Sequence, residues 1–119
     1  MLVDTAVWVD HLRGGDPVLI ELLEQARVSV HPFVVGEVAC GNLTQRVAVL
    51  ESMEALPMLT VVRHSDVMTF VHEHRLAGRG LGWIDVHLLA SASVANEVLL
   101  TRDRRLHAAA EELGLAAHF

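Results

Sequence analysis

The stretch Val98-Leu99-Leu100-Thr101-Arg102-Asp103 joins an apolar run typical of a buried strand to an acidic residue just past its carboxyl end. Beyond it, apolar residues repeat at the i, i+3, i+4, i+7 spacing of an amphipathic helix: Leu106, Ala109, Ala110 and Leu113. A short buried strand that leads into such a helix is the building unit of a parallel sheet. This stretch therefore predicts an α/β fold.

The same alternation extends over the rest of the chain. Short apolar or β-branched runs predict further strands at Leu2-Val3, at Val28-Ser29-Val30, at Leu59-Thr60-Val61-Val62 and near Ala116 to Phe119. Helical spacing or start signals predict helices at 19–26, from Pro32, at 49–56, at 67–74 and from Trp83. Strands that alternate with helices imply right-handed crossovers. We expect a three-layer α/β/α sandwich with a central parallel sheet of four to five strands.

Capping signals and chain length agree with this interpretation. Asp16-Pro17 is typical of an N-cap followed by proline at the first helical position, while Gly78 and Gly114 are predicted to end helices. A chain of 119 residues is long enough for one hydrophobic core and too short for two. We expect a single domain over residues 1–119.

Composition limits the classes of function. Hydrophobic residues make up 52% of the chain, which is rich for a small domain and favours a protein partner. The net charge of −6 argues against a nucleic-acid coating protein, but not against an enzyme whose acids hold metal ions. Cys40 is the only cysteine, which excludes an internal disulfide, and we expect it to be buried. No apolar run or basic leader indicates a membrane span or a signal peptide, so we expect a cytoplasmic protein.

Four acidic residues follow predicted strands or lie early in the helices that come after them: Asp4, Glu37, Asp85 and Asp103. Ligands of open α/β sheets bind at the carboxyl ends of the strands. The strand from Val98 to Thr101 runs back along the helix that begins near Trp83, so Asp103 returns to the level of Asp85. We therefore expect the four carboxylates to converge.

Converging carboxylates repel one another unless cations lie between them. Oxygen donors without a cysteine or paired-histidine motif favour Mg²⁺ or Mn²⁺ over zinc. Such ions activate water for attack on phosphorus, so phosphodiester hydrolysis is the expected chemistry. Each acid also has a structural alternative: Asp103 as a helix cap, Asp85 as a partner of a helix dipole, and Glu37 as a surface residue.

Four local motifs carry a family resemblance: Val3-Asp4-Thr5-Ala6-Val7-Trp8-Val9-Asp10, Gly36-Glu37-Val38-Ala39, Gly82-Trp83-Ile84-Asp85-Val86-His87-Leu88-Leu89-Ala90 and Thr101-Arg102-Asp103-Arg104-Arg105-Leu106. Together they resemble a PIN-domain ribonuclease, the VapC-type toxin of a type II toxin–antitoxin system. The resemblance covers Leu2 to about Gly114.

The resemblance implies a metal-dependent endoribonuclease that leaves a 5′-phosphate and a 3′-hydroxyl. It implies that Asp4 and Asp85 bind the metal most directly, while Glu37 and Asp103 contribute, in part through water. It also implies a cognate antitoxin, an RNA substrate and a homodimer. Two hydroxyl residues match supporting positions of the pocket, and either could instead only hydrogen-bond local backbone: Thr5 and Thr101.

Arginines near the predicted pocket are candidates for binding RNA phosphates: Arg79, Arg102, Arg104 and Arg105. They could equally pair with an acidic antitoxin segment or with internal carboxylates. No histidine is assigned to catalysis, because residues two apart on a helix point to different faces, as His72 and His74 do. The aromatic residues Trp8, Phe33 and Trp83 are expected in the core or a dimer contact.

Two other phosphate chemistries place an aspartate after the first strand, namely the phosphoryl-accepting receiver and the haloacid-dehalogenase-like phosphatase. Both typically add a lysine, and this chain has none. Asp4-Thr5-Ala6 also lacks the second aspartate that the phosphatase pattern expects. The alternative that remains is a catalytically silent PIN-like module that only binds RNA or protein.

Overall fold

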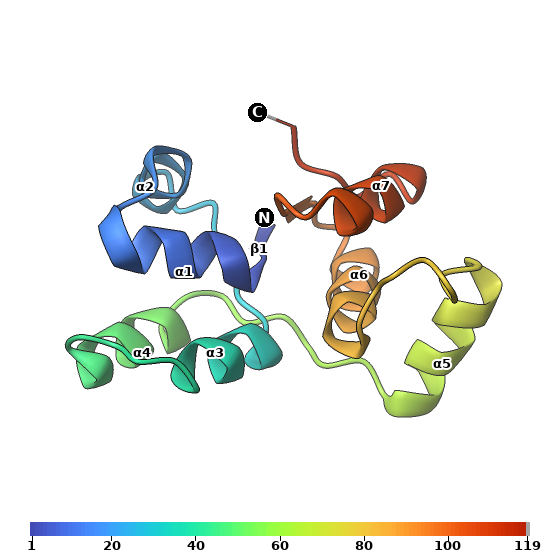
Figure 1. The fold of residues 1–119 in the computed structure, drawn as a ribbon, viewed down its shortest axis with the longest axis horizontal. Helices are drawn as coiled ribbons and strands as arrows, with labels where there is room; N and C mark the ends of the chain where they lie inside the picture. The colour runs from blue at the N-terminus through green and yellow to red at the C-terminus, as the bar shows by residue number, and fades with distance from the viewer. Residues whose placement is uncertain (119) are drawn as a thin grey trace.

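The fold is described from a computed structural model, for residues 1–118. In chain order the elements are β1 (Leu2–Val3), α1 (Thr5–Gly14), α2 (Pro17–Glu24), α3 (Pro32–Ala39), α4 (Arg46–Glu54), α5 (His64–Glu73), α6 (Trp83–Ala95), β2 (Leu99–Leu100) and α7 (Arg104–Glu112). Figure 1 shows β1 near the middle, with α1 to α4 on one side of it and α5 to α7 on the other. In this view helices thus lie on both sides of the strand region, and the three-layer sandwich stays a prediction.

The centre of the fold is a parallel pairing of β1 with β2, in which Leu2 is opposite Leu99 and Val3 is opposite Leu100. Three further segments join through single parallel bridges: Leu2 with Ser29, Val30 with Met58, and Leu99 with Ala116. The segments therefore lie side by side in the order 58, 29–30, 2–3, 99–100, 116. The parallel α/β arrangement is confirmed.

The expected count of four to five strands stays a prediction, because only β1 and β2 form strands among residues 1–118. The segment predicted at 59–62 enters the sheet only at its start, where Leu59 N donates to Val30 O at 2.8 Å. The segment near Ala116 exchanges two backbone hydrogen bonds with Leu99, and Phe119 lies outside the described residues. In each of these segments only one or two residues take part in a bridge: Ser29 and Val30, Met58, and Ala116.

The core is continuous from the strands to the helices on both sides. Its fully buried members include Leu2, Val3 and Leu99 from the strands. Helix α6 is buried over seven consecutive residues from Val86 to Ala92, which is typical of a helix packed on all sides. None of the described helices has the length and apolar character needed to cross a membrane.

Most helix boundaries follow the capping signals. Asp16 caps α2 through a 3.1 Å hydrogen bond from Leu19 N to its Oδ1, and Pro17 is the first helical residue. Gly114 follows α7 with a φ of 71°, in the left-handed region that favours glycine. The prediction for Gly78 is wrong, because α5 ends at Glu73 and Arg75 takes the left-handed position there, with a φ of 54°.

The prediction for Cys40 is wrong, whereas Trp83 lies outside the core and its expected role in a dimer contact stays a prediction. Cys40 is exposed, because it follows the last residue of α3 where the chain turns away from the core. Trp83 is 41% exposed at the first position of α6, whereas Trp8 is 4% exposed and belongs to the core as expected. Phe33 is half-buried.

Candidate active site

Asp4 lies directly after β1 and is buried, with 9% of its surface exposed. Its Oδ1 accepts a 2.8 Å hydrogen bond from Thr5 N, so Asp4 is also the N-cap of α1. Its Oδ2 accepts a 2.7 Å hydrogen bond from the Thr101 hydroxyl. Both carboxylate oxygens are therefore fixed in direction by the protein.

Thr101 connects the exits of the two strands. Its hydroxyl donates to Asp4 and accepts a 3.1 Å hydrogen bond from Asp103 N. Thr101 is itself buried, at 6% exposed. Because Thr101 directly follows β2, the parallel pairing of β1 and β2 brings its hydroxyl to Asp4.

Glu37 reaches the same region from α3. Its Oε1 accepts a 2.7 Å hydrogen bond from the Thr5 hydroxyl at the start of α1. Glu37 is exposed, so the rest of its carboxylate stays open to solvent. The two predicted supporting residues, Thr5 and Thr101, thus hold one acid each, Glu37 and Asp4.

Asp85 is the third residue of α6 and is half-buried. Its Oδ2 accepts a 2.8 Å hydrogen bond from Gly82 N, which caps the helix start. Asp103 is exposed and caps α7, because its Oδ1 accepts 3.0 Å hydrogen bonds from Arg105 N and Leu106 N. Asp85 and Asp103 therefore both stabilise the start of a helix, which is the structural alternative to metal binding considered for each. In each case one carboxylate oxygen remains free of these hydrogen bonds.

The electrostatics of Asp4 reveal an excess of negative charge. Burial raises the pKa of Asp4, the charges of Asp85 and Glu37 raise it further, and the hydrogen bonds from Thr101 and Thr5 oppose the change. Three carboxylates from distant parts of the chain thus act on one another. A cation would relieve the burial cost and the repulsion together.

The four acids do not form a closed cluster of ligands in the described residues. Among residues 1–118, no three of them have ligand atoms that all lie within 4.8 Å of one another. A hard cation that keeps several water ligands fits this loose set better than one that needs a closed protein cage. The all-oxygen donor set and the raised pKa of Asp4 therefore fit a hard divalent cation.

The four candidate arginines differ in their surroundings. Arg79 donates two hydrogen bonds to Glu112, at 2.6 and 3.0 Å, and Arg102 donates to Asp16. Arg104 and Arg105 are exposed and form no ion pair with residues 1–118. The last two thus keep their charge available for a ligand.

Two interactions near the site were not foreseen from the sequence. The hydrogen bond from Arg102 lowers the pKa of Asp16 to about 2, and it ties the exit of β2 to the start of α2. His31 caps α3, where its Nδ1 accepts from Phe33 N at 3.0 Å while its Nε2 lies 3.1 Å from Ser91 Oγ. Since Nδ1 accepts a hydrogen bond, the proton of the neutral ring is on Nε2. Burial lowers the pKa of His31 to about 4.

His11 and His87 remain outside the acidic site. His11 Nδ1 accepts a 3.1 Å hydrogen bond from Asp16 N. His87 is buried, and its ring packs against those of Phe33 and Trp83, each with a centroid distance of 4.7 Å. Neither contact points to proton transfer at the acids.

A parallel α/β fold with acidic side chains gathered around the carboxyl ends of its strands defines the class of protein, and comparison with known proteins identifies the family. The PIN domain family model matches residues 1–112, and the chain belongs to this family. It is also similar to Ribonuclease VapC32 of Mycobacterium tuberculosis, in two strains, with 46% identity over 117 residues. That match covers 98% of this chain and 94% of the relative.

Proposed function

We propose that this protein is a metal-dependent endoribonuclease and the toxin component of a VapBC-type toxin–antitoxin pair. One observation carries the proposal: Asp4, whose pKa is raised by burial and by the charges of Asp85 and Glu37, is held by the Thr101 hydroxyl and the Thr5 backbone at the end of the central strand. The similarity to a VapC ribonuclease over nearly the whole chain supports RNA as the substrate. We place this activity in the cytoplasm, as expected from the sequence.

In this proposal Asp4 and Asp85 hold the metal most directly, and Glu37 and Asp103 hold it through water. Mg²⁺ or Mn²⁺ bound there supplies an activated water and charge stabilisation at phosphorus. Glu37 accepts a hydrogen bond from the attacking water, while Thr5 keeps the Glu37 carboxylate oriented. Thr101 keeps Asp4 oriented in the same way. Hydrolysis leaves a 5′-phosphate and a 3′-hydroxyl.

Arg104 and Arg105 bind RNA phosphates in this proposal, because neither forms an ion pair with a carboxylate among residues 1–118. Arg79 and Arg102 contribute less, since Glu112 and Asp16 already pair with them.

We also propose that the bridged segments at 29–30, 58 and 116 complete a five-stranded parallel sheet, which carries the site residues.

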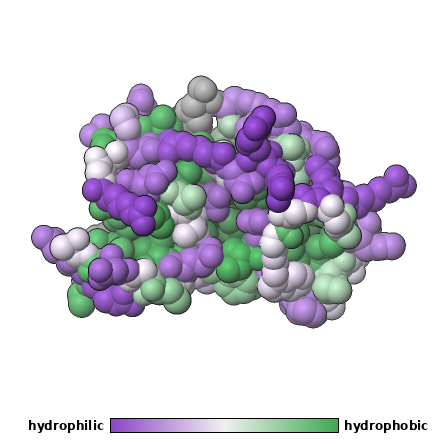
Figure 2. Space-filling view, in the orientation of Figure 1, coloured by the Kyte–Doolittle hydropathy of each residue, from purple (hydrophilic) through white to green (hydrophobic). Residues whose placement is uncertain are grey.

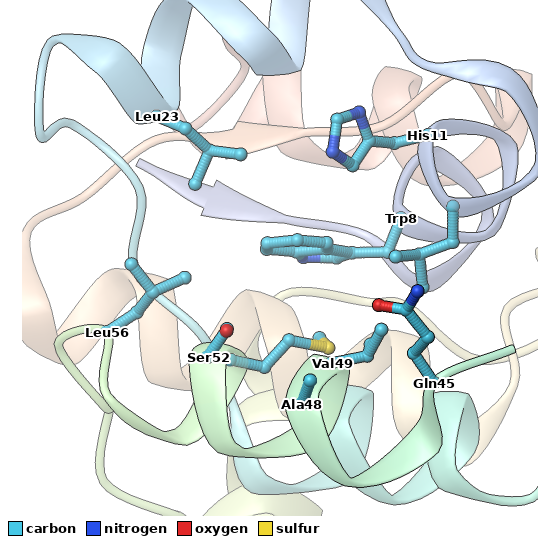
Figure 3. Close-up of a pocket in the computed structure, with 10 residues that line it drawn as sticks. Trp8, His11, Leu23, Gln45, Ala48, Val49, Ser52 and Leu56 are labelled. Atoms are coloured by element: carbon cyan, nitrogen blue, oxygen red, sulfur yellow. The ribbon is translucent and has the colours of Figure 1, made fainter. Parts of the chain in front are cut away.

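The antitoxin partner has a candidate surface between α1, α2 and α4. A cavity of about 400 Å³ lies there, and its lining includes Trp8, Leu23, Val49 and Met53. Figure 3 shows the Trp8 ring across this cavity, between Leu23 and the α4 side chains. Trp8 Nε1 is buried and donates no hydrogen bond within residues 1–118. An apolar antitoxin segment would pack against the apolar lining of this cavity.

A homodimer would cover part of the exposed apolar surface, and we include it in the proposal. Among residues 1–118, seven large hydrophobic side chains are at least 37% exposed: Ile20, Val47, Met58, Val61, Met68, Trp83 and Val94. Figure 2 shows hydrophobic patches among hydrophilic side chains on the face that it presents. Sedimentation of the purified chain with and without its antitoxin measures both assemblies.

The decisive experiment incubates the purified protein with total RNA and Mg²⁺ or Mn²⁺. Cleavage is compared between the parent and the variants Asp4→Asn and Asp85→Asn. Asp66→Asn is a matched control, because Asp66 is an exposed aspartate in the first turn of a helix, α5, remote in sequence from the four acids. We expect cleavage by the parent and the control only, with 5′-phosphate ends.

A catalytically silent binding module would give a different result. Such a protein would bind RNA or the antitoxin without metal-dependent cleavage, and the aspartate variants would cleave no less than the parent. Equal RNA degradation by the parent and both variants would refute the proposed site and assign the activity to a contaminant.

A further inference from the structure

A second group of ligating side chains lies on the C-terminal part of the chain, apart from the four acids. It consists of His107, Glu111 and His118, whose ligand atoms all lie within 4.8 Å of one another. Glu111 Oε1 lies 3.1 Å from His107 Nε2 and 3.7 Å from His118 Nε2. The two histidine rings meet edge to face, with centroids 5.6 Å apart.

The fold builds this group from two segments. His107 and Glu111 are four residues apart on α7, so their side chains share one face of the helix. Gly114 then turns the chain in the left-handed conformation, and the bridge between Ala116 and Leu99 directs the following residues back along the sheet. His118 returns in this way to the face of α7 that carries the other two ligands.

The donor set differs in chemistry from that of the acids. Two imidazole nitrogens with one carboxylate oxygen suit zinc and similar borderline cations, whereas all-oxygen sets suit Mg²⁺ and Mn²⁺. Zinc ligands at about 2.0 to 2.1 Å in a tetrahedron lie roughly 3.3 to 3.4 Å from one another. The distances of 3.1 and 3.7 Å bracket that value.

We propose that His107, Glu111 and His118 form a binding site for Zn²⁺ or a chemically similar divalent cation, and that the bound ion fastens the C-terminal segment to α7. The inference does not depend on the proposed ribonuclease function.

Room for a fourth ligand exists beside the group. His107 and His118 line a cavity of about 360 Å³ together with Leu100, Thr101 and Arg102. A water molecule occupies about 30 Å³ of liquid, so the cavity accommodates one in the open coordination position. The Arg102 guanidinium is paired with Asp16, and this pairing reduces its repulsion of a cation.

Exposure makes the site testable without loss of the fold. The side chains of His107, Glu111 and His118 are 33%, 50% and 69% exposed, so alanine replacements remove ligands without opening the core. The protein must carry no histidine tag and must be freed of metal with EDTA. Co²⁺ is the probe, because tetrahedral Co²⁺ absorbs visible light strongly, and Zn²⁺ is then added in competition.

We expect the parent to bind one Co²⁺ with a tetrahedral spectrum that Zn²⁺ abolishes. The affinity should fall at least about tenfold in His107→Ala and in His118→Ala, since loss of a supporting residue alone costs that much at metal sites. His72→Ala, which removes an exposed histidine of α5, and Asp4→Asn, which alters the acidic site, should leave the spectrum and affinity unchanged.

Three outcomes would overturn the proposal. The first is the absence of a tetrahedral Co²⁺ spectrum in the parent. The second is an affinity of His118→Ala within twofold of the parent value. The third is loss of the spectrum in Asp4→Asn, which would assign the bound ion to the acidic site.

Discussion

Replacing Thr101 with valine tests whether the hydrogen bond between the strand ends organises the acidic site. Valine keeps the branched shape of threonine and removes the hydroxyl that donates to Asp4 Oδ2 at 2.7 Å. Both residues are buried, and a hydrogen bond to a charged group contributes about 1.5 to 3 kcal/mol. We expect Thr101→Val to lower the free energy of unfolding by about 2 kcal/mol, which is about 8 °C in Tm for a domain of this size.

The matched control is Thr101→Ser, which keeps the hydroxyl and loses one methyl group. Burial of a methyl group is worth about 0.8 kcal/mol, so serine should cost less than valine. Thermal unfolding in EDTA measures both variants. If packing rather than hydrogen bonding governed the position, the order would reverse, and a serine variant less stable than the valine variant would refute the reasoning.

Activity gives an independent measurement of the same change. The Thr101 hydrogen bond lowers the pKa of Asp4 against the effect of burial. Its loss should therefore raise that pKa and move the acidic limb of the pH profile for RNA cleavage to higher pH in Thr101→Val. Thr101→Ser should keep the parent profile, and identical limbs in all three proteins would contradict the proposed positioning role.

Three further predictions use the ionisable groups. The pKa of Asp4 is raised above 3.8, so the metal-free parent loses stability as the pH rises through the folded-state pKa. Asp4→Asn should remove this loss and give a higher Tm than the parent at pH 7 in EDTA. The same variant should show no RNA cleavage in the assay with Mg²⁺ or Mn²⁺. The pKa of Asp16 is lowered to about 2, so its ion pair stabilises the fold above pH 3.8 and less as the pH falls toward 2. Because Arg102 is 45% exposed, we expect Arg102→Gln to cost only about 1 to 2 kcal/mol in urea unfolding at pH 7, with a smaller difference at pH 3. The pKa of His31 is lowered from 6.5 to about 4, so the stability that the neutral ring contributes is present above pH 6.5 and is lost as the pH falls toward 4. The free energy of unfolding of the parent should fall by about 2 kcal/mol between pH 6.5 and 5. His31→Asn should show a smaller fall over the same interval. A parent without such a loss would contradict the neutral, buried His31.

The helices with a clear apolar period could be predicted from the sequence, and one helix without such a period could not. In α7 the apolar spacing corresponds to the buried Leu106, Ala109 and Ala110. The sequence analysis predicts no helix at the position of α1, although Asp4 is the N-cap of this helix and so marks its start. The strand predicted at 59–62 is longer than the paired segment, in which only Leu59 N bonds to Val30 O. A β-branched run indicates strand propensity, but it does not indicate where the neighbouring backbone ends.

Asp4, Asp85 and Asp103 could be singled out from the sequence because each is an N-cap or stands in a first helical turn, which leaves a local signal, whereas Glu37 is the sixth residue of α3. Their connections could not, since Thr101 and Asp4 are 97 positions apart and no local pattern relates them. Tertiary contacts likewise decide which arginines keep a free charge, as the pairing of Arg79 with Glu112 shows. The roles of the four acids as metal ligands stay predictions.

The place of β1 between the segments at 29–30 and 99–100 has a consequence for synthesis of the protein. β1 is translated well before β2, although the two strands are neighbours in the sheet. At 5 to 20 residues per second, about 5 to 20 s pass between translation of Asp4 and of Thr101. A nascent chain therefore carries Asp4 without its Thr101 partner throughout that interval. If the proposed activity is correct, the acidic site of this nuclease is not formed until β2 has been made and has paired with β1.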